Sequence, residues 1–424
     1  MELEEFKLFI KDASLFVRYF GIAMAKSAPH VYVSALPFAP IKSLVSTKYS
    51  SLFPHTLLVE HGQLSHWPSS EMVLSNIGSR VLSISLSPDG QQIASGLDNN
   101  TICVWNTTIG EMVADPFTGH TGSVNSVDIS PDGQWVASGS DDETICIWNA
   151  MTGEAVAGPF TGHTSFVMSV KFSPDGQQIV SGSSDETICV WNIATGEMVA
   201  GPFIGHTDCV RSVDFSPNGQ WVVSGSDDKT ICVWNAITGE IVAGPFTVHT
   251  GWVRSVGFSP DGQWIVSGSN DKIICVWNAT TGEAVAGPIT GHTGSITSVG
   301  FSPDGHQIVS GSNDKTICVW NTITGKLVAG PFTGHLDSIN SVEFSPDGQF
   351  IISGSSDQTI RMWSLNSSRR DTMAGHMCSV KSVGSPSESD SKQFVSSEDK
   401  VIVILNSVTE GLITPHRSNS QISL

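Results

Sequence analysis

Charged side chains are scarce in this chain. Asp, Glu, Lys and Arg make up 14% of its 424 residues, whereas folded proteins average about a quarter. Basic residues are fewer than acidic ones: the chain has 21 Lys and Arg but 40 Asp and Glu, and its net charge is −19. The densest basic spot is the isolated pair Arg369-Arg370. Because an acidic protein repels phosphate backbones, the composition disfavours nucleic acid as a partner.

Long apolar runs and leader-like segments are also missing. The chain starts with Glu2, Glu4 and Glu5, the reverse of the positive start of a secretory signal. The apolar stretch 15–25 contains Arg18 and is too short to cross a bilayer. We therefore expect neither secretion nor a membrane partner.

Cysteines are few, and their spacing argues against disulfides and zinc. Equivalent positions of successive repeats are separated in space, so thiols at such positions cannot pair or share a metal ion. Free thiols are typical of a reducing compartment, and we expect a cytoplasmic protein without metal or cofactor. Six of the eight cysteines lie 43 residues apart at one such position: Cys103, Cys146, Cys189, Cys232, Cys275 and Cys318.

Motifs of several enzyme classes are absent. The sequence has no phosphate-binding loop, no Gly-rich dinucleotide motif that opens a helix after a strand, and no His-Glu-x-x-His zinc motif. The near match at Gly325-Lys326 lacks the upstream glycine and the following Ser or Thr. The sequence therefore offers no recognisable site for these chemistries.

What the chain does contain is a repeat of 43 residues. Tryptophans recur at this interval from Trp105 to Trp363, and histidines from His120 to His335. Each unit holds a turn that reads roughly Ser-Pro-Asp-Gly, in which proline presets φ and glycine takes a positive φ, between short apolar runs. The pattern predicts four short strands per unit. A sheet this small must bury its faces against neighbouring sheets.

Three features of the unit resemble WD-repeat β-propellers. These are the Gly-His start, the Ser-Pro-Asp-Gly turn and the Asp six residues before Trp. One departure is that Asn follows Trp in six units, where that family usually has Asp. The resemblance runs from about residue 72 to the C-terminus and implies an all-β ring of four-stranded blades.

The number of blades depends on the last unit. Seven units carry the Trp, and a decayed eighth keeps Gly375-His376 and Asp399 but has Leu405 in place of Trp. Counting this unit, we favour eight blades over seven; with seven blades the last unit would be an appendage. We expect the segment 72–74 to supply the outer strand that closes the ring and removes its open sheet edges.

The N-terminal region has a different pattern. Apolar residues at helical spacing predict an amphipathic α-helix over residues 2–26, followed by an extended, proline-dotted segment. We therefore divide the chain into an N-terminal region, 1–66, and a propeller, 67–424. The apolar positions of the helix are Phe6, Phe9, Ile10, Ala13, Phe16, Val17 and Phe20.

His, Ser and Asp recur in each unit and are the residue types of a hydrolytic triad. An enzyme needs one exposed constellation, whereas this set recurs six times around a ring. Buried polar groups must be hydrogen-bonded, so we interpret the set as a structural chain from His to Ser to Asp, with the Trp N–H also satisfied. The WD-repeat resemblance implies the same tetrads. They are His120, Ser138, Asp142, Trp148; His163, Ser181, Asp185, Trp191; His206, Ser224, Asp228, Trp234; His249, Ser267, Asp271, Trp277; His292, Ser310, Asp314, Trp320; and His335, Ser353, Asp357, Trp363.

Positions that differ between the repeats are free of the demands of the scaffold. The most variable ones lie two, three and five residues after His, and one residue before the tetrad Asp. In the WD-repeat family these positions lie on the upper face and the channel rim. Aromatic, Met and Arg side chains are favoured in protein-binding hot spots, so we predict a protein-binding patch here, the alternative being simple drift of surface loops. The candidates are Phe166, Met168, Arg211, Trp252 and Arg254, with Asn125, Asn340, Asp227 and Asn270 as further members.

The units are nearly identical, and the stretch 27–40 reads Ser-Ala-Pro-His-Val-Tyr-Val-Ser-Ala-Leu-Pro-Phe-Ala-Pro. Together these features resemble the C-terminal part of fungal NACHT-type NTPase proteins with WD-repeat tails, a group that includes vegetative-incompatibility proteins. That resemblance implies the recognition end, without the NTPase. We expect a non-enzymatic recognition or scaffold module that binds proteins or peptides. The alternatives are an adaptor in a constitutive complex, such as ubiquitin ligation or RNA processing, and an enzyme acting in the central channel.

Overall fold

The computed structural model describes most of the repeat region and small parts of the rest. The described residues are 70–75, 77–365, 43–49, 393–396 and 402–405, with the single residues Phe9, Ala13, Phe16, Leu36 and Ala39. The chain divides into two compact units, Pro68–Gly375 on the one hand and Met1–Trp67 with His376–Leu424 on the other. The second unit contains helix α3 (Leu44–Tyr49) and the antiparallel pair β28 (Gln393–Ser396) and β29 (Ile402–Leu405).

Most of the helix predicted over residues 2–26 lies outside the described residues. Its described members Phe9, Ala13 and Phe16 are helical. Phe16 is buried with Leu36, Ala39 and Val45, and Phe9 and Ala13 pack against this cluster. These three residues fall on the apolar stripe that the sequence indicates.

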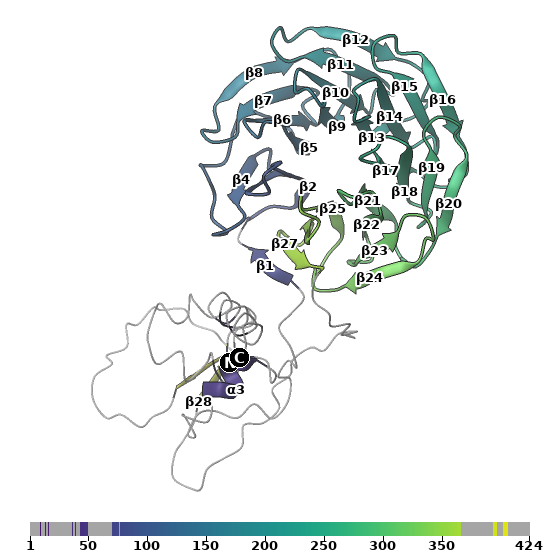
Figure 1. Ribbon diagram of the computed structural model, residues 1–424. Coiled ribbons are helices and arrows are strands. Elements are labelled where there is room, and N and C mark those ends of the chain that lie inside the picture. The colour runs from purple at the N-terminus through teal and green to yellow at the C-terminus, as the bar shows by residue number, and fades with distance from the viewer. Residues whose placement is uncertain are drawn as a thin grey trace, which may run out of the picture. The chain divides into compact units, whose positions relative to one another are not determined.

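The first unit is a ring of seven antiparallel sheets, or blades (Figure 1). The strands lie in sequence order from the centre of the ring to its rim. Blade 1 contains β2 (Val81–Leu86), β3 (Gln92–Leu97) and β4 (Ile102–Asn106); blade 2 contains β5 (Val124–Ile129), β6 (Trp135–Ser140), β7 (Ile145–Asn149) and β8 (Ala155–Phe160); blade 3 contains β9 (Val167–Phe172), β10 (Gln178–Ser183), β11 (Ile188–Asn192) and β12 (Met198–Phe203); blade 4 contains β13 (Val210–Phe215), β14 (Trp221–Ser226), β15 (Ile231–Asn235) and β16 (Ile241–Phe246). Blade 5 contains β17 (Val253–Phe258), β18 (Trp264–Ser269), β19 (Ile274–Asn278) and β20 (Ala284–Ile289); blade 6 contains β21 (Ile296–Phe301), β22 (Gln307–Ser312), β23 (Ile317–Asn321) and β24 (Leu327–Phe332); blade 7 contains β25 (Ile339–Phe344), β26 (Phe350–Ser355), β27 (Ile360–Ser364) and, as its outermost strand, β1 (Ser70–Leu74).

The expectation of eight blades is wrong, because the ring closes after seven. Strand β1 pairs antiparallel with β27, with Leu74 opposite Ile360. The inner strand β2 contacts β25, and the N–H of Ile84 donates to the Ser341 hydroxyl oxygen at 3.2 Å. In the last unit of the sequence, the described strands β28 and β29 pair with each other and belong to the second compact unit. The expected closing strand over 72–74 is confirmed as part of β1.

Local chemistry explains where the strands turn. In blade 3 the Ser-Pro-Asp-Gly turn is closed by the N–H of Gly176, which donates to the Ser173 carbonyl at 2.8 Å, and Gly176 has a φ of 69°. The Ser173 hydroxyl donates to Asp175 at 2.5 Å. After the third strand, Oδ1 of Asn192 accepts the N–H of Thr195 at 3.0 Å. An Asn oxygen thus serves in this turn as acceptor, which explains why Asn can replace the Asp usual after Trp.

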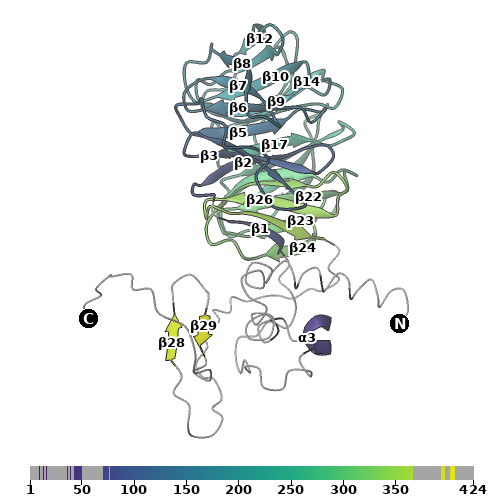
Figure 2. The same cartoon turned by 90° about the vertical axis from the view of Figure 1, so that its left-hand side faces the viewer.

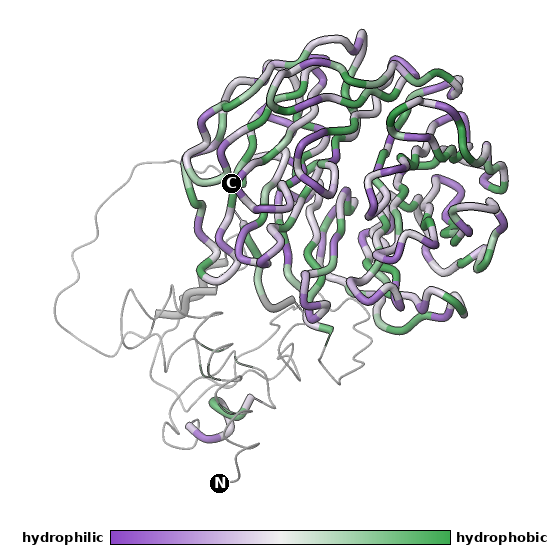
Figure 3. Tube along the Cα trace, turned by 45° about the horizontal axis from the view of Figure 1, so that its top comes forward, coloured by the Kyte–Doolittle hydropathy of each residue, from purple (hydrophilic) through white to green (hydrophobic). Residues whose placement is uncertain are grey.

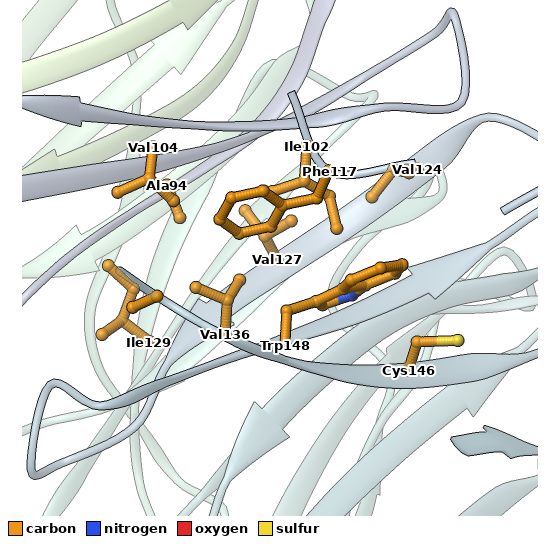
Figure 4. Packing of buried hydrophobic residues seen from close by; sticks show 11 residues of the cluster. Ala94, Ile102, Val104, Phe117, Val124, Val127, Ile129, Val136, Cys146 and Trp148 are labelled. Atoms are coloured by element: carbon orange, nitrogen blue, oxygen red, sulfur yellow. The ribbon is translucent and has the colours of Figure 1, made fainter. Parts of the chain in front are cut away.

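The core lies between neighbouring blades. In the cluster around Trp148, residues of β3 and β4 such as Ile102 pack against Val127 of β5 and Val136 of β6 (Figure 4). The repeated Ser-Gly-Ser run allows this approach, because a Cβ at Gly182 would lie 2.7 Å from a methyl carbon of Val210 in the next blade. The second and third strands of a blade, such as β10 and β11, are runs of buried residues, as expected for strands covered on both sides, and hydrophobic stretches recur all around the ring (Figure 3).

Serine side chains join the innermost strands to one another. An innermost strand has one edge without a strand partner, and its backbone N–H groups need other acceptors. The hydroxyl oxygen of a serine in each blade accepts such an N–H from the next blade, at 3.0–3.2 Å. The seven serines are Ser83, Ser126, Ser169, Ser212, Ser255, Ser298 and Ser341.

The ring has two loop-bearing faces (Figure 2). The upper face carries the loops that enter the inner strands, which hold the tetrad histidines, and the turns between second and third strands, which hold the tetrad aspartates. The lower face carries the Ser-Pro-Asp-Gly turns and the turns after the third strand.

Candidate functional site

The six tetrads have one geometry. In blade 2, Nδ1 of His120 lies 2.8 Å from Oδ2 of Asp142, and Nε2 lies 2.7 Å from the Ser138 hydroxyl. Nε1 of Trp148 donates to the same hydroxyl oxygen at 2.8 Å. The other five sets repeat these contacts within 2.7–3.0 Å. The hydrogen bonds run from Asp to His to Ser, whereas we expected the order His, Ser, Asp.

This order determines the hydrogen positions. The Asp carboxylate accepts a hydrogen bond from the Nδ1–H of His, Nε2 accepts one from the serine hydroxyl, and the serine oxygen accepts one from the Trp N–H. The histidine side chains are at most 1% exposed. Burial opposes ionisation of Asp185, yet hydrogen bonds from His163 and Thr187 hold the pKa of its carboxyl well below the ordinary value. Every polar side chain of a tetrad has a hydrogen-bond partner. The tetrad connects an upper-face loop to a turn and does not expose a nucleophile.

The structure brings five of the predicted binding residues together on blades 4 and 5. Arg211 and Arg254 each lie at a register shift of an inner strand, in β13 and β17, where a bulge redirects a side chain. Their guanidinium carbons lie 5.8 and 5.3 Å from the ring centroid of Trp252, within cation–π range. The Trp252 side chain remains 41% exposed. Together with Asp227 and Asn270, these residues form what we term the arginine–tryptophan patch.

The two arginines of the patch have different partners. Nε of Arg211 donates to both carboxylate oxygens of Asp227, at 2.9 and 3.0 Å, and Nη2 donates to one of them at 2.6 Å. Nε of Arg254 donates to the amide oxygen of Asn270 at 3.0 Å. Burial and the neighbouring Arg211 lower the pKa of Arg254. One guanidinium is therefore neutralised within the patch and the other is not.

The remaining candidates lie elsewhere on the ring. The Asn125 amide donates to Asp141 of its own blade at 2.7 Å and to the Val167 carbonyl of the next. Asn340 donates to the Val81 carbonyl at 2.7 Å and so connects blades 7 and 1. Phe166 lies in the loop that enters β9 and is 47% exposed. Met168 lies within β9, 3.8 Å from the Asn125 amide nitrogen. The two asparagines connect blades, and Phe166 is an exposed apolar residue on blade 3.

Sequence reasoning missed a set of charges on the upper face. The residue directly after each tetrad Asp has a positive φ of 66–73° and is exposed to solvent. Its residue type differs between the blades. These positions hold Glu143 and Glu186 on blades 2 and 3, but Lys229, Lys272 and Lys315 on blades 4 to 6. We term the three lysines the lysine row. The sign change could have been found by comparing this position across the repeats.

A second missed set lines the inner strands near the lower face. At one repeat position stand Asp128, Lys171, Asp214 and Glu343, with Ser85, Gly257 and Gly300 in the other blades. Nζ of Lys171 lies 2.7 Å from Asp128. Burial raises the pKa of Asp214 to about 6 and that of Glu343 to about 7, although Lys171 acts against both shifts.

Asp214 and Glu343 line a cavity of about 330 Å³ that opens among the Ser-Pro turns. Each carboxylate accepts a backbone N–H of the next blade: Asp214 from Phe258 at 2.9 Å, and Glu343 from Leu86 at 3.0 Å. Asp128 does the same for Phe172 at 2.8 Å. These acidic groups therefore connect inner strands. Within the described ranges no cluster of three or more His, Cys, Asp or Glu could hold a metal ion, and no helix is long and apolar enough to cross a membrane.

Comparison with known proteins agrees with the architecture. The family model "WD domain, G-beta repeat" matches seven stretches, 71–106, 111–149, 155–192, 199–235, 242–278, 285–321 and 325–364. Among known relatives, "Vegetative incompatibility protein HET-E-1" of Podospora anserina is 42% identical over 101 residues. That alignment covers 24% of this chain and 7% of the relative's length. Seven matched stretches correspond to the seven blades.

Proposed function

Because this chain belongs to the WD-repeat family, we propose that it is a recognition module that binds another protein at the arginine–tryptophan patch. Propellers of this family generally act as non-enzymatic interaction scaffolds that bind other proteins. The similarity to a vegetative incompatibility protein favours recognition over a purely architectural role. The proposal includes a role as the sensor half of a fungal NACHT-type self/non-self recognition protein.

One observation carries the proposal: a large aromatic ring is held in place and left exposed. Trp252 lies within cation–π distance of two arginines and still exposes 41% of its side chain. Trp and Arg dominate protein-binding hot spots, because a rigid ring offers a large contact area at low cost in conformational entropy. The scaffold does not require Trp here, since Ser, Phe and Cys stand at the equivalent position in other blades.

The test is a quantitative pulldown with the full chain from the cells that express it. We compare wild type with Trp252→Ala, and use Ile237→Ala as the matched control, because Ile237 is an exposed apolar residue (83%) in a lower-face turn. Partners that depend on the patch should fall on the order of tenfold with Trp252→Ala and stay unchanged with Ile237→Ala. Full recovery of every partner by Trp252→Ala would overturn the proposal. Whether the recovered partners are subunits of a constitutive complex distinguishes a sensor from an adaptor.

A further inference from the structure

The charges around the patch indicate the chemistry of the partner. Resting on the proposed function, we infer that the upper face of blades 4 to 6 binds an acidic polypeptide segment, whose carboxylates pair with Arg254 and the lysine row while an adjacent apolar side chain contacts Trp252.

The contrast between the two arginines is the first argument. Asp227 supplies Arg211 with a carboxylate, but the equivalent position of the next blade is Asn270, which offers Arg254 only a neutral amide oxygen. Among the described residues no carboxylate lies within ion-pair distance of Arg254. A guanidinium pairs best with a carboxylate in bidentate geometry. Arg254 therefore has the free capacity for a carboxylate that an incoming chain would bring.

The distribution of basic residues is the second argument. Only nine Lys and Arg lie between residues 68 and 364. Five of these nine are on the upper side of blades 4 to 6, at the start of inner strands or in the turns between second and third strands: Arg211, Lys229, Arg254, Lys272 and Lys315.

The surroundings of the lysine row leave its charges available. Lys229, Lys272 and Lys315 are all exposed, and Nζ of Lys315 donates to the Leu336 carbonyl at 2.7 Å. The tetrad aspartates beside them are hydrogen-bonded to histidines. The equivalent turns of blades 2 and 3 carry Glu143 and Glu186, so the upper face changes sign around the ring. Such a pattern attracts an acidic segment to one side of the ring and repels it from the other.

The distribution of charge favours a polypeptide over a nucleic acid as the partner. The chain has a net charge of −19, which repels a long phosphate backbone. The exposed anions Asp208, Glu143 and Glu186 lie on the same face. Asp208 is on blade 4, near enough to Arg211 to raise the pKa of that arginine. A short segment that mixes acidic and apolar side chains can match Arg254 and Trp252 on blade 5 without extending over Glu143 and Glu186 on blades 2 and 3.

A substitution at Asn270 tests the inference without removing any basic residue. Asn270→Asp gives Arg254 an internal carboxylate, as Asp227 gives Arg211, and three blades of this chain already have Asp at that position. Asn270→Ala is the matched control, because it removes the amide without adding charge. The probe is a random copolymer of glutamate and tyrosine, and its affinity for the immobilised full chain is measured by biolayer interferometry. We expect Asn270→Asp to weaken binding about tenfold and Asn270→Ala to change it less than about twofold.

A second pair of variants tests the lysine row. Lys229→Glu with Lys272→Glu should weaken binding of the copolymer by on the order of tenfold. Lys326→Glu is the control, since Lys326 is an exposed lysine in a lower-face turn; it should bind like wild type. Polyuridylate is the competing class of ligand and should not bind at about 0.15 M salt.

The outcomes separate this inference from the proposed function. If Trp252→Ala abolishes binding of the cellular partner while Asn270→Asp and the lysine variant bind the copolymer within twofold of wild type, the acidic class is wrong and the patch stands. Absence of copolymer binding to wild type also overturns the acidic class. If polyuridylate binds more tightly than the copolymer and its binding depends on the same lysines, the partner is a nucleic acid and not a polypeptide. If Trp252→Ala changes nothing in the pulldown, the proposed function fails.

Discussion

The hydroxyl oxygen of Ser341 accepts a hydrogen bond from the N–H of Ile84, at 3.2 Å and across 257 positions of the chain. It connects blade 7 to blade 1 with the same contact that connects Ser83 to Val127 in neighbouring blades. Together with β1 on the edge of β27, this contact completes a ring of seven.

Ring closure leads to a prediction about truncation. A chain that ends after Leu365 retains every strand of the seven blades, so its propeller should melt at the temperature of the full chain. Leu74→Ala removes a buried side chain from β1 and should lower the free energy of unfolding by about 3 kcal/mol. Thermal unfolding followed by circular dichroism compares the two. A propeller that melts far lower after loss of residues 366–424 would indicate that this segment completes the ring.

The tetrads should be important for stability. His206→Ala leaves Asp228 and Ser224 with unsatisfied hydrogen-bonding groups, and we expect it to lower the free energy of unfolding by about 1–3 kcal/mol. His306→Ala is the matched control, because His306 is exposed in a lower-face turn. Urea titrations measure both. Equal stability of His206→Ala and wild type would count against the network.

The acidic groups on the inner strands predict that the stability of the fold depends on pH. Burial raises the pKa of Glu343 from 4.5 to about 7, so the folded chain holds this proton over a pH range in which the unfolded chain has released it. Stability then decreases as the pH rises from about 4.5 to about 7. Glu343→Gln keeps an oxygen acceptor for the Leu86 N–H and should flatten this decrease in melting temperatures recorded from pH 5 to 8. Glu283→Gln, at an exposed site, should leave the profile of wild type unchanged.

Cysteine labelling offers an independent check of the packing. The thiols of Cys146 and Cys189 are buried, and burial raises their pKa to about 11 and about 12. Thiolates are the reactive form, so native chain at pH 8 should take up iodoacetamide at these positions far more slowly than urea-unfolded chain. Peptide mass spectrometry reports the extent at each cysteine. Fast labelling of Cys189 in native chain would contradict the packing of blade 3.

Much of the fold could be predicted because the sequence features that define a blade lie within that blade. Turn residues, alternating strands and the spacing of Trp are local features that recur every 43 residues. The number of blades is not local. Residues Gly375-His376 and Asp399 match the repeat pattern. The edge of β27, however, is covered by β1, which comes from the other end of the repeat region. No local pattern shows which of two segments will occupy an edge.

The site was predictable only in part, for a similar reason. Arg211, Trp252 and Arg254 could be found because they differ from the rest of their repeat position. The different pairing of the two arginines depends on side-chain geometry across a turn, with Asp227 against one and Asn270 against the other. Likewise, Asn125 and Asn340 vary like surface residues, yet their amides connect neighbouring blades.

We propose that repeating residues build the scaffold and that non-repeating residues of the upper face bind the partner. The most direct measurement compares the double variant Trp252→Ala with Arg254→Ala against wild type, for melting temperature and for partner recovery in the same preparation. We expect a loss of binding on the order of tenfold or more with a melting temperature within about 2 °C of wild type. Recovery of every partner at full strength by a folded double variant would contradict it.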